Sequence, residues 1–316
     1  MKKNILFIFL FTALNLLSQE KFSKEISFIT ENDLYTSLKN DRYYTNGMFL
    51  SFRYLSKKKK ENLEKRILEW SIGHEMYTPY KAIVLSVNDH DRPFSGYLYG
   101  SFGFENVYKN NKNLKITGQL GVIGSNAYAK ELQDFIHDIY GFRKAIGWQY
   151  QIKNALALNF GVTYNKQLLK TSSKAFDVSW INNANAGTVY TNITTGFMAR
   201  IGFEPLQNIA NSIAFKTNIN DENTRFFREI ESFIFIKPSV RYAVYDATLQ
   251  GSFLNKNSEV TNELVPIVFD LEIGFKFTSN RFSWGYTFNY NTNKSKGLRF
   301  DNGQKYGSIN VSYLLR

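Results

Sequence analysis

The sequence predicts an all-β protein, a transmembrane antiparallel β-barrel of about twelve strands with a short helix inserted between two of them. Apolar and polar residues alternate over segments of roughly ten residues, as tilted membrane strands require. Hydrophobic residues make up 43% of the chain and aromatic residues 16%, yet after the N-terminus no apolar run is long enough for a membrane helix. Alternation with period two puts successive side chains on opposite faces, so one face can meet lipid and the other a polar interior.

The N-terminus has the features of a secretory signal. Lys2 and Lys3 precede an apolar run from Ile5 to Leu17, which is too short to span a bilayer as a helix and fits export. The alternative is a buried N-terminal helix. We expect cleavage near Gln19, so that residues 1–18 are the signal peptide and residues 19–316 a single barrel domain. The chain has only 5 Pro and no long polar linker, so a second domain is not indicated.

The alternation is clearest in the C-terminal third, over Ile267 to Thr278 and Phe282 to Asn291. A soluble β-sandwich also alternates and is the alternative fold, but long strands with aromatic faces favour the barrel. Further strands are expected near residues 24–31, 48–54, 68–77, 94–108, 114–122, 147–153, 155–165, 193–204, 232–245, 247–254 and 306–315. Polar stretches predict turns or loops at residues 57–60, 106–113, 182–185, 218–225 and 255–262.

One segment, from Ser125 to Ala145, breaks the alternation. Its apolar residues recur with helical spacing, and Gly141 is a suitable stop signal. A helix inserted between barrel strands is unusual and suggests a functional element. The apolar residues on one side of it are Leu132, Phe135, Ile136 and Ile139.

Two groups of residues could carry chemistry. His137, one of three histidines, lies on the expected helix one turn after Asp134, which could contact the imidazole. From spacing alone a solvated polar helix face is the simpler interpretation. The second group is Glu31-Asn32-Asp33 with the nearby run from Asp41 to Gly47. Such oxygen ligands suit Ca²⁺, although Asn, Asp and Gly are also the ordinary residues of hairpin turns.

Charge and missing motifs narrow the function. The formal net charge of +12 at pH 7 suits a phosphate-bearing partner, either nucleic acid or lipopolysaccharide, and export favours the second. The sequence has no Gly-x-Ser-x-Gly elbow, no His-Glu-x-x-His motif and no phosphate-binding glycine loop. The standard soluble hydrolase, zinc peptidase and nucleotide-binding classes are therefore not indicated.

Several short motifs, taken in order, resemble the outer-membrane lipid A 3′-O-deacylase family over most of the mature chain. Each motif is short, but the ordered set is fairly specific. The resemblance implies a twelve-stranded barrel in the bacterial outer membrane, with its site between the barrel wall and the inserted helix. The motifs are Glu31-Asn32-Asp33, Asp41-Arg42-Tyr43-Tyr44-Thr45-Asn46-Gly47, Tyr77-Thr78-Pro79, Asp91-Arg92-Pro93-Phe94-Ser95-Gly96, Gly121-Val122-Ile123-Gly124, the helix with Glu131, His137 and Gly141, and Gly147-Trp148-x-x-Gln151-Ile152.

The same resemblance implies roles for individual residues. Asn32 and Asp33 would lie at a Ca²⁺ site, Thr45 in the active site, and His137 would act as the base. Lys81 is a candidate for the family's cationic loop residue, which contacts an oxyanion or phosphate. The implied reaction is Ca²⁺-dependent hydrolysis of the 3′-linked acyl or acyloxyacyl ester of lipid A, the lipid anchor of lipopolysaccharide. We expect a monomer that does not bind nucleic acid.

One position departs from the family pattern. The family has a glutamate six residues after the histidine, where this chain has Arg143. Either another carboxylate, Asp138, Asp134 or Glu131, takes its place, or the activity is altered or lost. Two other functions remain open: a non-catalytic barrel acting as a pore or structural protein, and an outer-membrane phospholipase with a serine nucleophile.

Overall fold

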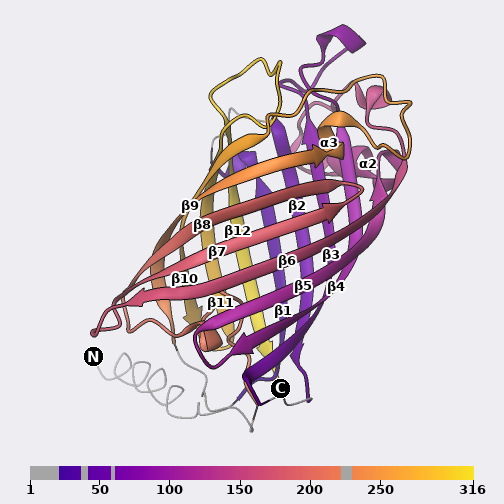
Figure 1. The fold of residues 1–316 in the computed structure, drawn as a ribbon. Helices are drawn as coiled ribbons and strands as arrows, with labels where there is room; N and C mark the ends of the chain where they lie inside the picture. Colours follow the sequence, from indigo (N-terminus) through magenta and orange to yellow (C-terminus); the bar gives the residue numbers. More distant parts are fainter. Residues whose placement is uncertain (1–20, 37–41, 58–60, 222–229) are drawn as a thin grey trace, which may run out of the picture.

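The computed structural model describes residues 21–36, 42–57, 61–221 and 230–316. The predicted signal peptide, residues 1–18, lies outside them. Within the described residues, twelve antiparallel strands form one closed barrel (Figure 1), which confirms the predicted fold class. Each strand pairs with its sequence neighbours, and β1 (Lys24–Asn32) closes the barrel against β12 (Gln304–Leu315). The others are β2 (Tyr43–Leu55), β3 (Leu63–Thr78), β4 (Ser95–Tyr108), β5 (Lys112–Ile123), β6 (Ala155–Lys170), β7 (Phe176–Gly187), β8 (Tyr190–Gly202), β9 (Ser232–Asp246), β10 (Ile267–Ser279) and β11 (Phe282–Asn291).

The outer wall of the barrel is apolar and its interior is polar. On β1, Ile26 and Phe28 are exposed on the outside, whereas Glu25 and Ser27, at the alternate positions, are buried. Ion pairs join strands inside the barrel: Lys237–Glu272 and Arg241–Asp270 link the neighbours β9 and β10, and Lys115–Glu69 links β5 to β3. A soluble sandwich would bury its apolar face, so this arrangement overturns that alternative and fits a barrel surrounded by lipid.

The structure differs from the sequence prediction at four segments. Of the loop predicted at residues 106–113, only residues 109–111 form the turn, because β4 runs to Tyr108 and β5 begins at Lys112. Residues 147–153 are not a strand but contain the 3-10 turn η4 (Trp148–Tyr150). Residues 247–254 begin with the short helix α3 (Ala247–Gln250), which Asp246 caps, and continue as a loop. Residues 182–185 lie within β7, where Asn183 donates a hydrogen bond to Thr163 on β6. No helix within the described part of the chain is long and apolar enough to cross a membrane.

The two ends of the barrel carry different connections. The loop end carries the described residues 33–36 and 42, together with 79–94, 124–154, 247–266 and 292–303. The turn end carries the shorter connections 109–111, 171–175 and 280–281 and the described residues 56–57 and 61–62. Bacterial outer-membrane barrels keep short turns in the periplasm and long loops outside, so the loop end is expected at the cell surface. The predicted inserted helix is confirmed as α2 (Ala129–Tyr140) in the third of these loops (Figure 1).

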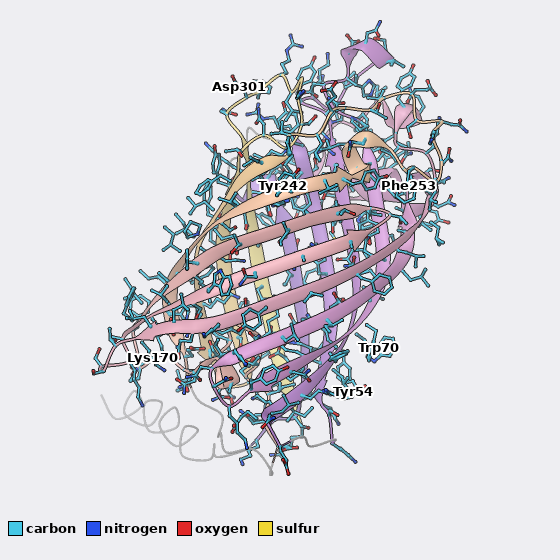
Figure 2. All side chains as sticks on the ribbon, viewed as in Figure 1. Tyr54, Trp70, Lys170, Tyr242, Phe253 and Asp301 are labelled. Carbon is cyan, nitrogen blue, oxygen red and sulfur yellow. The ribbon has the colours of Figure 1, made fainter. Side chains whose placement is uncertain are left out.

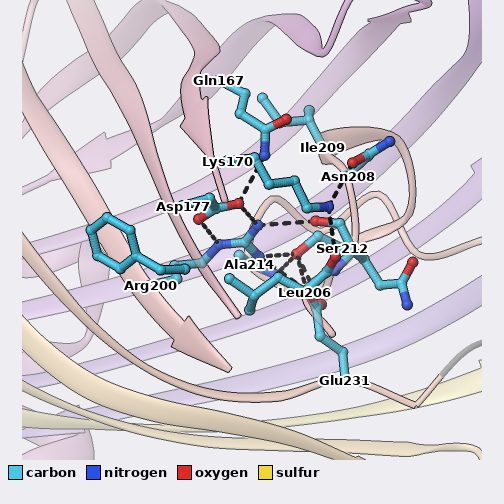
Figure 3. Close-up of polar contacts among 12 residues, drawn as sticks. Gln167, Lys170, Asp177, Arg200, Leu206, Asn208, Ile209, Ser212, Ala214 and Glu231 are labelled. Carbon is cyan, nitrogen blue, oxygen red and sulfur yellow. Dashed lines mark hydrogen bonds and ion pairs between the residues drawn. The ribbon is translucent and has the colours of Figure 1, made fainter. Parts of the chain in front are cut away.

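One connection at the turn end is long and folds into the barrel. Residues 203–221, which we call the lumen plug, follow β8, and their 3-10 turn η5 (Ile209–Asn211) contacts β4 and β5, which are not neighbours of β8. Figure 3 shows the ionic network that anchors the plug: Arg200 of β8 pairs with Asp177 of β7 at 2.6 Å and with Glu231 at 3.0 Å. The plug therefore crosses the interior of the barrel from β8 to β4 and β5.

Candidate functional site

The outer wall becomes polar where β1 and β2 reach the loop end. Asn32 lies on the same face of β1 as the lipid-exposed Ile26 and Phe28, because it follows them by even intervals. Asn46 of β2 is paired with Asn32 and with Met76 of β3, so it shares this face. Asn46 is only 4% exposed. A patch of amide groups is thus present on the outside of the barrel, with Asn46 buried and Asn32 partly exposed.

A β-bulge brings Thr45 to this patch. The register between β2 and β3 shifts between Tyr44 and Asn46, so Tyr44 still points inward, where its hydroxyl donates to Glu31 at 2.5 Å. Thr45 is the extra residue that such a bulge leaves outside the regular ladder. Its Oγ1 lies 2.6 Å from Oγ1 of Thr78 on β3, and both side chains are buried.

Asp33 follows directly at the end of β1. It begins the 3-10 turn η1 (Asp33–Tyr35), which Asn32 caps by accepting a hydrogen bond from the Leu34 amide at 2.8 Å. The Asp33 carboxylate is 1% exposed and accepts a hydrogen bond from the Arg42 amide at 2.6 Å. Asn32, Asp33, Thr45 and Asn46 therefore all lie at the loop ends of the paired strands β1 and β2.

Helix α2 lies on the outside of the barrel, over β3 and β4. Its buried residues Ala129, Gln133 and His137 recur every four positions and form one face. Gly96 lies on the outward face of β4 and lets the helix approach the strand backbone, because a Cβ at this position would be 2.6 Å from the Cβ of Ala129. The helix face that carries His137 is thus turned toward the outer wall.

The segments before and after α2 hold it in place. His74 on the outer face of β3 hydrogen-bonds the Ala127 carbonyl oxygen through Nε2 at 2.9 Å. Trp148 of η4 donates its indole N–H to Gln133 at 2.8 Å. Beneath the helix lies a small apolar core formed by Met76, Val84, Phe94, Ala129, Ala145 and Trp148.

Only part of the predicted apolar stripe of the helix faces away from the protein, because Leu132 packs against the apolar core beneath the helix. Phe135 and Ile139 are 61% and 63% exposed, and Tyr140 and Phe142 are exposed beside them. Next to a lipid-facing wall such a face is stable against the membrane. The interpretation of His137 as part of a solvated polar face is wrong, because this side chain is 5% exposed and lies on the covered side.

A backbone carbonyl orients His137. Its Nδ1 lies 2.7 Å from the Arg143 carbonyl oxygen, and a carbonyl can only accept, so Nδ1 donates. In the neutral ring this leaves Nε2 with the lone pair. Gly141, with φ of 71°, caps the helix and reverses the chain so that residue 143 returns to the imidazole. Asp134, a sequence candidate for contacting His137, instead pairs with Lys130 at 2.7 Å.

Lys81 lies in the second loop and is exposed. The next residues run beside the chain that leaves α2: Ile146 donates to the Ala82 carbonyl at 2.8 Å and Val84 donates to the Ile146 carbonyl at 2.9 Å. The Lys81 ammonium lies 5.1 Å from the centre of the Tyr80 ring. Lys81 is therefore close to the α2 segment in the fold and projects from the rim.

Sequence reasoning missed Asn46, Thr78, Gly96, Gln133 and Trp148 as parts of this site, although most lie within the motifs quoted above. A usable signal exists in the strands: Asn32 and Asn46 are polar residues on strand faces that otherwise carry outward apolar residues, such as Phe28 on β1 and Leu50 on β2. Such a position is costly on a membrane wall unless another element covers it.

The interior of the barrel is separate from this site. It holds a cavity of about 370 Å³, lined by charged and tyrosine side chains such as Glu31, Glu75, Tyr77 and Arg241, and none of Asn32, Asp33, Thr45 or His137 lines it. In the described ranges no group of three or more His, Cys, Asp or Glu side chains is placed to share a metal ion. An ion at the outer site would accordingly depend on one carboxylate with amide and hydroxyl oxygens.

A closed barrel with an apolar outer wall and an ion-paired interior is the architecture of a bacterial outer-membrane protein. The chain belongs to the family described as outer membrane protein LpxR, whose profile matches residues 5–315. Among solved structures, LpxR from Salmonella typhimurium is similar with a TM-score of 0.72 and 18% identity, over 92% of this chain and 100% of that one. At this identity the likeness shows the fold alone.

Other solved barrels are less similar. The β domain of the Bordetella autotransporter BrkA has a TM-score of 0.47 and 6% identity, over 94% of this chain and 99% of that one. The translocator domain of the autotransporter NalP from Neisseria meningitidis has a TM-score of 0.42 and 7% identity, over 96% and 92%. No curated protein sequence matches the chain.

Proposed function

We propose that this protein is a Ca²⁺-dependent esterase that removes the 3′-linked acyl or acyloxyacyl chain of lipid A in the outer leaflet. The observation that carries the proposal is the burial of His137 between α2 and the outer wall, on the side of the barrel where Asn32, Thr45 and Asn46 also lie. A lipid can reach this position from the membrane without entering the barrel. The resemblance of the site motifs to lipid A 3′-O-deacylases supports the substrate.

His137 is arranged to act as a general base. Because Nδ1 donates to the Arg143 carbonyl oxygen, Nε2 of the neutral ring can accept a proton from a water molecule. The water oxygen then attacks the acyl carbonyl carbon, the bond to the sugar oxygen breaks, and the proton on His137 passes to that oxygen. The products are a free fatty acid and a lipid A hydroxyl group, and no covalent acyl-enzyme is needed.

The arginine at the family's glutamate position is compatible with this role. Residue 143 contacts His137 through its main-chain carbonyl, which is the same for arginine and glutamate. The substitution therefore leaves this hydrogen bond to the imidazole in place. Of the carboxylates considered as substitutes, Asp138 is exposed and pairs with Lys144 at 3.2 Å. Orientation by the backbone makes a substitute carboxylate unnecessary for holding the ring.

The oxygen atoms of the site fit a calcium ion. Asp33 offers a buried carboxylate, and Asn32 and Asn46 offer amide oxygens, which are ligands that Ca²⁺ prefers. The Asn46 Oδ1 atom is buried and has no hydrogen-bond partner among the described residues, and a cation would satisfy it. We propose that Asp33 holds the ion with the help of these amides. A bound Ca²⁺ would supply positive charge that stabilises the oxyanion of the transition state.

Mass spectrometry of lipid A tests the proposal. Purified protein with Ca²⁺ should lower the mass of lipid A by that of its 3′-linked acyl group, and a calcium chelator should prevent the change. His137→Gln and Asp33→Asn should abolish the loss. Asp138→Asn, on the same helix but exposed, is the matched control and should keep it. Unchanged lipid A after incubation with the wild-type protein would refute the proposed function.

The two alternatives are tested separately. A pore is disfavoured by the lumen plug, since Lys65 of β3 binds Ile219 and Asn220 of the plug at 2.8 and 2.7 Å across the interior. Ion conductance in planar bilayers without lipid hydrolysis would favour the pore. A serine phospholipase would be inactivated by serine-directed reagents, whereas hydrolysis by a water molecule that His137 activates would continue in their presence.

A further inference from the structure

A second feature of the outer wall lies in line with the candidate site. An apolar groove of about 730 Å³ runs over β1 to β6 on the lipid-facing side. No charged side chain lines it. Its lining is Ile26, Leu50, Ser51, Phe52, Trp70, Ser71, Ile72, Gly100, Ser101, Phe102, Gly118, Gln119, Leu120 and Phe160.

Two glycines form the floor of the groove. Gly100 lies between Ile72 and Leu120 in one row of paired outward positions, and Gly118 lies between Phe102 and Phe160 in the next row. A Cβ at Gly100 would meet no atom within 4 Å, and one at Gly118 would meet only the Phe160 ring, at 3.8 Å. Missing side chains thus create the depression, and large neighbours form its sides.

The sides of the groove stand well out from the barrel. Trp70, which Figure 2 shows on the outside of the wall, is 55% exposed, and its ring centre lies 4.5 Å from that of Phe102. Leu120 and Phe160 on the other side are 61% and 66% exposed. These side chains form walls on either side of the glycine floor and can contact a narrow molecule laid between them.

The groove and the candidate site lie on the same outward face of β4. Gly96, under α2, and Gly100, on the groove floor, lie on the same face of β4 four residues apart, which is about 13 Å along the strand. Leu98, between them on that face, is apolar and paired with His74. The groove therefore lies on the turn-end side of the site, deeper in the hydrocarbon layer.

We infer that this groove binds the acyl chain of the lipid whose ester is hydrolysed beside His137, an inference that rests on the proposed function. An acyl chain fits the position because it is apolar, narrow and already present in the surrounding bilayer. Leaving the bilayer for a lipid-facing groove brings no hydrophobic gain, so the benefit is close packing. The groove therefore acts by fixing the chain, and with it the position of the ester relative to the base.

Gly100→Phe tests the inference, because the ring would fill the groove without meeting neighbouring atoms at Cβ. Val240→Phe is the matched control, since Val240 is exposed on the outside of β9 and also gains a ring facing lipid. We expect Gly100→Phe to lower kcat/KM for long-chain lipid A by about tenfold or more through displacement of the ester. The rate with a synthetic short-chain lipid A should stay at the wild-type value, and Val240→Phe should change neither.

A binding measurement makes the result independent of hydrolysis. In calcium-free buffer, a lipid A analogue with a photoreactive acyl chain should label groove peptides of β3 and β5 even in an excess of phospholipid. Gly100→Phe should remove this labelling and Val240→Phe should not. If the wild type does not hydrolyse lipid A but the groove peptides are still labelled in an excess of phospholipid, the proposed function is refuted and the groove inference stands. If hydrolysis occurs and Gly100→Phe changes neither the chain-length dependence nor the labelling, the groove inference is refuted.

Discussion

Gly96 is the position at which a single methyl group should separate α2 from the barrel. In Gly96→Ala the new Cβ would lie 2.6 Å from the Cβ of Ala129 and 3.1 Å from that of Ala127. Carbon atoms in contact prefer about 3.5 to 4.0 Å, so the helix must move away by about 1 Å. A displacement of that size at a catalytic group costs about 100-fold in rate, or about 2.7 kcal/mol in the activation free energy.

The barrel itself should tolerate this change, because the added methyl group lies on the outer wall and meets the helix and not the strand ladder. The assay is kcat/KM for lipid A hydrolysis, with thermal unfolding of the barrel as the check on folding. Ala199→Val, on the outward side of β8 away from α2, is the control and should leave both values unchanged. Adding Ala129→Gly to Gly96→Ala should recover much of the rate, since it removes the opposing methyl group.

A folded Gly96→Ala variant that hydrolysed lipid A at the wild-type rate would contradict this prediction. That result would mean that the distance between His137 and the wall does not control the reaction. A loss of rate that Ala129→Gly failed to recover would also count against it, because the steric contact would then not be the cause.

Three further predictions concern the lumen plug and the helix cap. Arg200→Met leaves two buried carboxylates without their cation, which typically costs about 3 to 5 kcal/mol. We expect this variant to pass ion currents in planar bilayers where the wild type passes none. A variant that passes no current would contradict the role of the plug. Burial lowers the pKa of Lys216 in the plug from 10.5 to about 8. Between pH 8 and 10.5 the unfolded plug therefore binds more protons than the folded plug, so the free energy of unfolding the plug should rise with pH. Below about pH 8 the contribution of Lys216 to this free energy is constant. Hydrogen exchange of the plug, corrected for intrinsic rates, should show this rise in the wild type and not in Lys216→Met. Gly141→Ala strains a residue with φ of 71° by about 1 kcal/mol and should lower hydrolysis through misplacement of His137, without a change in the thermal unfolding of the barrel.

The strands that sequence predicted well are those with two chemically different faces. β10 and β11 coincide closely with the predicted segments because their outward residues are apolar and the intervening ones polar. β7 was missed because asparagines occupy both faces near its loop end, with Asn182 and Asn185 at positions of opposite parity. The sequence of this segment then shows no alternation of apolar and polar residues, although backbone hydrogen bonds to strands on both sides hold it as a strand. Residues 147–153 alternate weakly but pack beneath a helix, a tertiary contact that local pattern does not encode.

The site was partly predictable for a related reason. Helical spacing located α2 and its histidine, but not which face would be buried, because next to a membrane the apolar face need not turn toward the protein. His137 is covered on the side with Ala129 and Gln133, while Phe135 and Ile139 face outward. Antiparallel pairing of β1, β2, β3 and β4 in sequence order brings the ends of β1 and β2 beside the strands on which this helix rests.

Placement of the site on the outer wall and not in the interior has an energetic reason. An acyl chain drawn into the polar interior would lose its apolar surroundings at about 0.8 kcal/mol per CH₂, or about 8 kcal/mol for ten such groups. On the outer wall the chain stays among apolar side chains and lipid throughout the reaction. The two glycines of β4 should therefore be separable by experiment: Gly96→Ala should slow hydrolysis of short and long chains alike, because it displaces the base, whereas Gly100→Phe should slow only the long ones. A common dependence on chain length would show that helix and groove do not act at distinct parts of the substrate.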